Sequence, residues 1–196
     1  EETGDLLHQR ATVLLHGGAL EDAADHFRRA EERARTVGVR DKVATARRGL
    51  GDVARLRGDT ARARAYYEDA LQACAANWFS VAETARVFTG LGRVALAESR
   101  PEEAADWFEQ ARVLAVDAPG VGELAEVAEA LAAAASLPRD AARLLGAAAG
   151  IRGTLIEGHP DVVPVQEAAR ARLGTAAYGE AFAAGRREGA RAVGRG

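Results

Sequence analysis

Residues 58–70 read GDTARARAYYEDA, and the spacing of the small and aromatic residues in this stretch recurs along the chain. Here Ala63, Tyr67 and Ala70 follow Gly58. Three other places carry the same pattern of a turn residue, an alanine, a large apolar residue and an alanine: Gly18, Ala23, Phe27 and Ala30; Ser99, Ala104, Phe108 and Ala111; and Ser136, Ala141, Leu145 and Ala148. The first alanines of successive units lie 40, 41 and 37 residues apart. Self-similarity at such a period predicts stacked helix pairs, which form a solenoid and not a single closed core.

The spacing within each unit has a physical reason. Residues three and four positions apart share one face of a helix. Two alanines on that face let the partner helix approach closely, and the large residue between them fills the remaining volume. Gly51 and Gly92 stand twelve residues before Ala63 and Ala104, whereas Glu129 stands at this place in the fourth unit. Glycine costs a helix about 1 kcal/mol relative to alanine. Its recurrence therefore predicts a tight helix crossing, and Glu129 indicates a degenerate, capping unit.

With Gly51, Gly58, Ala63, Tyr67 and Ala70, the second unit resembles a tetratricopeptide repeat, and the third unit resembles one in the same way. The usual period of that repeat is about 34 residues, so each helix is expected to be about one turn longer here. The resemblance implies an all-α, right-handed superhelical solenoid of about four helix pairs with C-terminal capping helices. It also implies a concave surface, lined by the first helix of each pair, that binds a protein or peptide. The lysine and asparagine clamp of the chaperone-binding members is absent, so capture of a chaperone's C-terminal tail is not expected.

Segments near the C-terminus resemble one particular class of proteins that contain such repeats. Residues 141–148 (AARLLGAA), 171–174 (ARLG) and 181–186 (AFAAGR) are similar to the terminal repeat region of large ATP-dependent (STAND ATPase) transcriptional regulators of actinobacteria, of the LuxR and SARP types. This similarity implies a non-enzymatic module of a bacterial regulator that binds a protein or senses an effector. Its partner would be another protein, a peptide or another domain of the same parent protein.

Two other hypotheses stay open. The chain is alternatively a stand-alone scaffold that forms a homo-oligomer through its end repeats, and solution mass across a concentration series would separate this reading from the first. A small-molecule effector site within the superhelix is the third reading. It would be supported by ligand-induced thermal stabilisation that vanishes when Arg48 or Arg93 is changed.

Composition agrees with a helical solenoid and excludes several classes of protein. The 196 residues are 48% hydrophobic but only 5% aromatic, as closely packed, alanine-rich helices require. A net charge of -3 argues against direct nucleic-acid binding, and no apolar run approaches the length of a membrane span. The lone Cys74 is compatible with a reducing cytoplasm. Because the chain opens at Glu1 and lacks methionine, we expect it to be a fragment of a longer protein.

The chain is expected to form one domain of ten helices. The expected segments are helix pairs at roughly 3–37, 41–75, 79–116 and 121–152, a loop at 153–164, and capping helices within 165–192. Ser99 is predicted to cap a helix that has Pro101 in its first turn. Tyr178 and Phe182, four residues apart, are predicted to cover the apolar face of the last repeat.

Nothing in the sequence favours catalysis or a cofactor. The triplets at 49–51 and 90–92, both Gly-Leu-Gly, resemble the start of a dinucleotide fingerprint, but neither follows a predicted strand or completes the third glycine. The only lysine, Lys42, follows Asp41, so a phosphate-binding loop ending in Gly-Lys-Ser/Thr is absent. We expect no enzyme activity and no cofactor.

The histidines do not form a metal-ligand pattern. Two helical turns separate His8 from His16, His26 lies in the following helix, and His159 stands in isolation in the proline-containing loop. No metal site is expected, and these residues are interpreted as ordinary surface or interhelix histidines.

The predicted binding surface is an arginine-lined groove on the concave face. Mapping the repeat onto the second and third units places these side chains inward: Arg48, Asp52, Arg55, Arg86, Thr89 and Arg93. Such a groove would receive an acidic peptide or a carboxylate through bidentate contacts. The alternative is that the arginines form a solvated helix face and pair with neighbouring acids. Trp78, Phe79 and Trp107 are predicted to pack between repeats.

Overall fold

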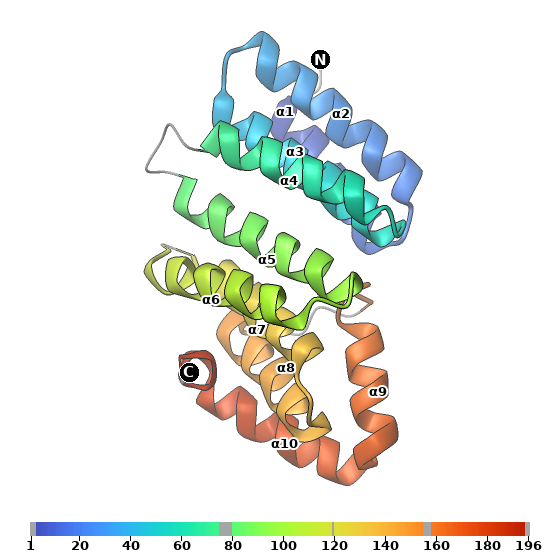
Figure 1. The fold of residues 1–196 in the computed structure, drawn as a ribbon, viewed down its shortest axis with the longest axis vertical. Helices are drawn as coiled ribbons and strands as arrows, with labels where there is room; N and C mark the ends of the chain where they lie inside the picture. The colour runs from blue at the N-terminus through green and yellow to red at the C-terminus, as the bar shows by residue number, and fades with distance from the viewer. Residues whose placement is uncertain (1–2, 75–79, 119, 155–157, 195–196) are drawn as a thin grey trace.

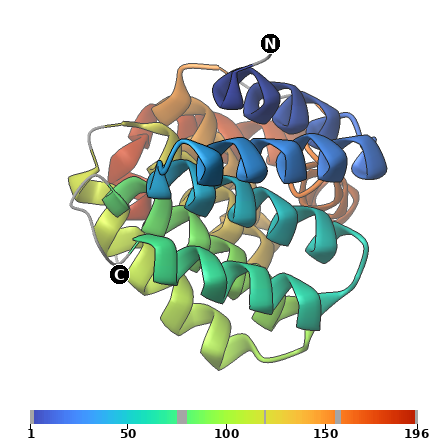
Figure 2. The ribbon, with the colours of Figure 1, turned by 90° about the horizontal axis from the view of Figure 1, so that it is seen from above.

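The computed structural model describes residues 3–74, 80–118, 120–154 and 158–194. Within these ranges the chain forms eleven helices and no strand. The first eight are consecutive pairs: α1 (Gly4–His16) with α2 (Leu20–Thr36), α3 (Arg40–Leu56) with α4 (Thr60–Cys74), α5 (Val81–Ala97) with α6 (Pro101–Asp117), and α7 (Gly122–Ala134) with α8 (Pro138–Arg152). Figure 1 shows the pairs stacked along the long axis of the molecule, and Figure 2 shows the helices of the first pairs lying side by side. The predicted all-α solenoid of four helix pairs is confirmed.

Each of the first three helix pairs has one buried aromatic ring in its core. Phe27, Tyr67 and Phe108 are at most 1% exposed. A Cβ atom added at Gly51 would lie 2.7 Å from a ring carbon of Tyr67, and one added at Gly92 would clash with the ring of Phe108. The tight helix crossing predicted from these two glycines is therefore confirmed.

The first glycine of each Gly-Leu-Gly triplet has a separate role that the sequence did not reveal. A Cβ atom at Gly90 would lie 2.5 Å from the Cζ atom of Tyr67, which belongs to the preceding pair. Gly49 has the same relation to Phe27 of the first pair. Each triplet thus lies between two aromatic rings, one from its own pair and one from the pair before it. This arrangement joins successive pairs into one stack.

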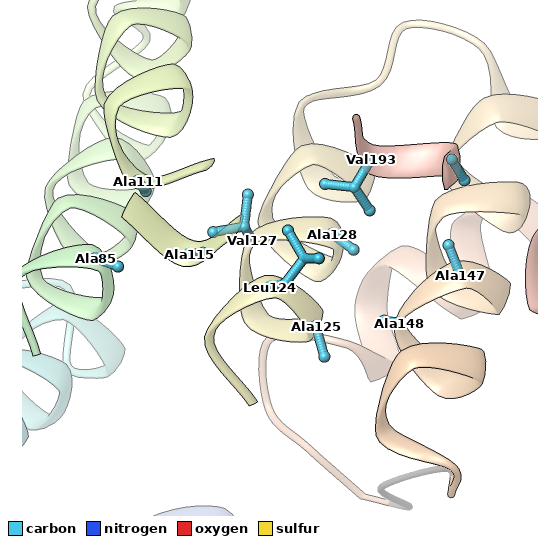
Figure 3. Close-up of a cluster of buried hydrophobic side chains, with 11 residues drawn as sticks. Ala85, Ala111, Ala115, Leu124, Ala125, Val127, Ala128, Ala147, Ala148 and Val193 are labelled. Carbon is cyan, nitrogen blue, oxygen red and sulfur yellow. The ribbon is translucent and has the colours of Figure 1, made fainter. Parts of the chain in front are cut away.

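Small residues extend the core toward the C-terminus. One cluster includes Ala85 of α5, Ala111 of α6, Val127 of α7 and Ala148 of α8, and Figure 3 shows these side chains following one another from pair to pair. Val193 of the short helix α11 (Ala190–Val193) closes the cluster. Alanine and valine dominate it because the helices approach too closely for larger side chains.

The turns within the first three pairs depend on a left-handed residue. Gly18 has φ 78° and Gly58 has φ 81°, and Ser99 takes the same place in the third pair with φ 58°. The prediction that Ser99 caps the next helix is wrong. The N-cap residue of α6 is Arg100, and no side chain accepts a hydrogen bond there. The serine is therefore a substitute for glycine in the turn and not a helix cap.

The fourth pair departs from the glycine and aromatic pattern at Glu129, the position that the sequence indicated. Glu129 is 5% exposed, and its Oε1 atom lies 2.7 Å from Nη1 of Arg152 on the paired helix α8. Leu145 replaces the aromatic residue and is 3% exposed. The fourth unit therefore still forms a helix pair, because Arg152 of α8 compensates the charge of the buried Glu129 carboxylate of α7.

Two further helices, α9 (Val163–Leu173) and α10 (Thr175–Glu188), pack against α8, as Figure 1 shows. Tyr178 and Ala181 of α10 are buried against Ala141 and Ala142 of α8, which confirms that this helix covers the last repeat. The predicted loop is shorter than expected, because α9 begins at Val163 and holds a proline in its first turn. The capping helices expected within 165–192 are interrupted at Gly189, which has φ 52° and separates α10 from α11. No helix in the described part of the chain has the length and apolarity needed to cross a bilayer.

Candidate functional site

A polar cavity of about 210 Å³ lies among the first helices of the four pairs. Helices α1, α3, α5 and α7 provide its walls, and residues 159–161, which precede α9, close one side. We call this space the central cavity. Its lining includes charged and imidazole side chains from segments far apart in the sequence: His8, His16, Arg48, Arg86, Glu126 and His159.

Five of the six predicted surface residues line the central cavity or bridge its wall. Arg48, Asp52 and Arg55 reach it from α3, and Arg86 and Arg93 reach it from α5. Thr89 does not. It is 1% exposed, and its hydroxyl donates a hydrogen bond to the carbonyl oxygen of Ala85 at 2.9 Å. The repeat mapping placed Thr89 on the correct helix, but its side chain faces the packed interior.

Arg48 is held by two carboxylates. Its Nε atom donates to Oε1 of Glu83 at 2.6 Å, and its Nη1 atom donates to Oδ2 of Asp52 at 2.9 Å. The other oxygen of Asp52 accepts a hydrogen bond from the Tyr67 hydroxyl at 2.8 Å. Burial alone would lower the pKa of the Arg48 guanidinium, but Glu83 and Asp52 raise it above its ordinary value. Arg48 therefore pairs with neighbouring acids, as the alternative hypothesis expects, but it is not part of a solvated face, because its side chain is only 16% exposed.

A second arginine repeats this arrangement one unit further along. The Nη2 atom of Arg86 lies 2.7 Å from Oε1 of Glu123 on α7. Glu83 and Glu123 are 40 residues apart, so each acid starts a first helix and takes an arginine from the first helix before it. Sequence reasoning missed both acids, although their spacing equals the repeat period and would have revealed them.

Arg55 and Arg93 bind a carboxylate that comes from outside the repeats. The Nη1 and Nη2 atoms of Arg55 donate to Oδ1 and Oδ2 of Asp161 at 2.7 and 2.8 Å. The Nη1 atom of Arg93 lies 3.3 Å from Oδ2 of the same residue. Burial would raise the pKa of Asp161, but Arg93 and Arg55 hold it well below its usual range. A carboxylate of the chain itself thus occupies the groove where an acidic partner was expected.

The turn that carries Asp161 also brings His159 into the central cavity. Its ring lies 4.6 Å, centroid to centroid, from the ring of His16, so the expectation that His159 is isolated is wrong. Its Nδ1 atom accepts a hydrogen bond from the backbone N–H of Asp161 at 3.2 Å. Burial, followed by the charge of Arg93, lowers the pKa of His159 to about 4. The imidazole is therefore neutral at pH 7.

The arginines retain donors that Asp161 does not use. Within the described residues, Nε of Arg55 and Nη2 of Arg93 are buried and have no hydrogen-bond partner. The side chains of both arginines are nearly buried, with 10% and 13% exposure. The site can therefore supply further N–H groups to an acceptor in addition to one carboxylate. Nowhere in the described ranges do three or more His, Cys, Asp or Glu side chains gather as metal ligands would.

The aromatic residues outside the repeat pattern have a packing role where they are described. The Nε1 atom of Trp107 donates to Oε1 of Glu103 at 3.2 Å, and the ring centroid lies 5.2 Å from that of Phe88. The predicted packing of Trp78 and Phe79 falls on residues outside the described ranges.

A family model described as tetratricopeptide repeat matches residues 2–76, which contain α1 to α4. Tetratricopeptide repeats generally mediate protein–protein interaction, and the fold is typically a non-catalytic scaffold. No curated protein matches the chain.

Proposed function

We propose that the chain is a non-enzymatic, protein-binding or effector-sensing module of a bacterial transcriptional regulator. Its binding surface would be the arginine-bearing wall of the central cavity, and its partner would present a carboxylate. Within this surface, Arg55 and Arg93 would bind the partner directly, whereas Arg48, Asp52 and Arg86 would keep the wall in place.

One observation carries the proposal. Two arginines from successive first helices converge on a single carboxylate, that of Asp161, and one of them does so bidentately. Planar guanidinium groups recognise carboxylates in this way with both energy and geometric specificity. Burial strengthens the discrimination, because an apolar side chain in place of the carboxylate would leave the donors that now reach Asp161 unsatisfied as well.

A peptide array tests the binding chemistry. Short immobilised peptides would carry Asp or Glu, and matched peptides would carry Asn or Gln at the same positions. We expect D161N, in which no carboxylate of residue 161 occupies the groove, to retain acidic peptides over their amide counterparts, and D161N/R55Q/R93Q to lose that preference. The variant R112Q serves as control, because Arg112 pairs locally with Glu109 on α6 and lies outside the lining of the central cavity. Equal retention of acidic and amide peptides would contradict the proposal.

The regulatory part of the proposal needs a separate experiment. It is supported by the similarity of residues 141–148 and 171–186 to the terminal region of actinobacterial regulators. Introducing R93Q into the chromosomal gene should alter the abundance of a defined set of transcripts while the amount of the protein stays the same. An unchanged transcript profile, with R93Q folded and present at the normal level, would refute a role in transcription.

A further inference from the structure

We propose that residues 159–161 are a tethered occupant of the partner site, and that the partner is a peptide segment that presents an aspartate in a tight turn and takes their place. The inference rests on the proposed function, because it requires that Arg55 and Arg93 bind a partner's carboxylate. It adds the shape of the partner segment and the condition that the site must be vacated before binding.

The turn has the properties of a separate ligand. The backbone N–H groups of Val162 and Val163 both donate to the carbonyl oxygen of His159 at 3.0 Å. The backbone N–H of Asp161 donates to the imidazole of the same residue, and Pro160 restricts the backbone between them. These bonds lie within the turn itself. A segment with the same local structure would thus present its carboxylate in the same orientation when it comes from another chain or domain.

The side of the site that receives the turn belongs to distant parts of the fold. Arg55 lies 106 residues before Asp161, and Arg93 lies on the next first helix. His16 of α1 adds the ring contact with His159. The repeats thus provide the receptor half and the loop provides the ligand half.

Tethering explains why an external partner would have to compete. A segment on a short connection has an effective concentration of about the millimolar range, so a free copy of the same segment at lower concentration cannot displace it. A natural partner can bind more tightly than the tethered turn by offering a second acceptor to Nε of Arg55 or Nη2 of Arg93, which Asp161 leaves unused. The contact therefore acts as a built-in competitor that sets a threshold for partner binding.

The experiment uses the loop sequence itself as the probe. A fluorescent peptide of residues 158–163, GHPDVV, would be titrated by anisotropy into the wild-type chain, into D161N and into a variant with glycine at positions 159, 160 and 161. The matched peptide carries Asn in place of Asp161. We expect both variants to bind the aspartate peptide at least about tenfold more tightly than the wild-type chain does. Adding R55Q to either variant should abolish binding, whereas adding R112Q should not change it. Circular dichroism would establish that each variant keeps its helices.

The possible results separate the two proposals. If the wild-type chain and D161N bind the aspartate peptide equally and through Arg55, the tethered-occupant inference is wrong and the proposed function stands. If neither the wild-type chain nor the variants bind any form of the peptide, both are refuted. Binding of the asparagine peptide as tightly as the aspartate peptide would refute carboxylate recognition.

A measurement on the wild-type chain covers the case in which the variants do not fold. The rings of His16 and His159, which lie 4.6 Å apart, would be followed by NMR in an isotope-labelled chain while the unlabelled peptide is raised to millimolar excess. Displacement predicts that contacts between these two rings weaken with the aspartate peptide and are unchanged with the asparagine peptide. Unchanged contacts at saturating aspartate peptide would overturn the inference.

Discussion

At the scale of single residues, Ser99 has a left-handed backbone conformation, and glycine stands at this position in the turns of the first two pairs. Its φ of 58° matches the left-handed values of Gly18 and Gly58. The left-handed region costs a non-glycine residue roughly 1–2 kcal/mol, whereas glycine adds about 0.4–1 kcal/mol of unfolded-state entropy. We predict that S99G raises the free energy of unfolding by roughly 0.5–1 kcal/mol, measured by urea denaturation. The variant G58A should lower the free energy of unfolding, because alanine disfavours the φ of 81° at this position. A Cβ atom at Gly58 would meet no neighbour within 4 Å, so this variant tests the backbone conformation alone. Destabilisation by S99G would contradict this account.

His159 gives the molecule a predicted sensitivity to acid. Burial and Arg93 lower its pKa to about 4, below the value of about 6.5 in the unfolded chain. Because protonation favours the unfolded state, the stability that this residue contributes is complete above pH 6.5 and is lost as the pH falls toward 4. We predict that H159N, which keeps an acceptor for the N–H of Asp161, flattens the decrease in unfolding free energy between pH 6.5 and 4.5. His8 has its pKa lowered to about 4 by burial and by Arg48, so H8N should flatten the decrease further, and burial lowers the pKa of His16 in the same direction.

The pH window for this experiment is set by Asp161. The pKa of that carboxylate is held below its ordinary value, so its contribution is present above about pH 3.8 and is lost only at lower pH. Urea denaturation at pH 7, 5.5 and 4.5 therefore separates the histidines from Asp161. Burial raises the pKa of Glu126 above its ordinary value, which acts with the opposite sign in this window, so each variant is compared with the wild-type chain at the same pH. If H159N loses stability with acid as steeply as the wild-type chain does, His159 is not a source of the acid sensitivity.

At the scale of the helix, glycines on the first helices leave room for the aromatic rings that pack against them. A Cβ atom at Gly51 or Gly90 would lie within 2.7 Å of the Tyr67 ring, whereas one at Gly179 in α10 would meet nothing within 4 Å. Alanine in an open helix position gains roughly 1 kcal/mol over glycine, but overpacking a core costs roughly 1–3 kcal/mol. We predict that G51A and G90A lower the free energy of unfolding and that G179A raises it. Thermal and urea denaturation of the three variants would measure this change of sign. Stabilisation by G51A would show that the crossing has room for a methyl group.

The elements that follow the repeat period could be predicted from the sequence, and those outside it could not. The pattern at Ala63, Tyr67 and Ala70 predicted both the helix pair and its buried ring because packing imposes a fixed spacing. The same spacing placed Ser99 at the turn, but the prediction that it caps α6 failed because residue type does not reveal the left-handed backbone angle. Asp161 was missed for a stronger reason. It lies on a segment whose path depends on three-dimensional contacts with α3 and α5, and no period relates it to Arg55.

At the scale of the whole molecule, the contact between Asp161 and α3 changes how the solenoid is expected to unfold. In a repeat array each unit contacts mainly its neighbours, so stability is close to a sum of local terms and parts of the array can unfold separately. Helices α9 and α10 pack mainly on α8, at the C-terminal end of the stack. The ion pairs of Asp161 with Arg55 and Arg93 connect this end directly to the second and third pairs. They are therefore expected to make unfolding more cooperative than nearest-neighbour contacts alone would.

Removing the carboxylate charge tests this connection. D161N removes the acid of the nearly buried Arg93 and leaves Arg55 with only its longer contact to Asp52 at 3.8 Å, and breaking a buried ion pair in this way costs on the order of 3 kcal/mol. We predict that D161N lowers the free energy of unfolding by about that amount and also reduces the denaturant dependence, or splits the transition in two, because the C-terminal helices can then separate first. The control E109Q removes a surface pair whose acid is 57% exposed, so it should change stability by at most about 0.5 kcal/mol and leave the transition single. Hydrogen exchange would locate the effect, with faster exchange expected in α9 and unchanged protection in α2. A single transition of unchanged steepness in D161N would mean that the array unfolds as one unit without this contact, and that the cooperativity of the molecule comes from the packed glycine and aromatic surfaces alone.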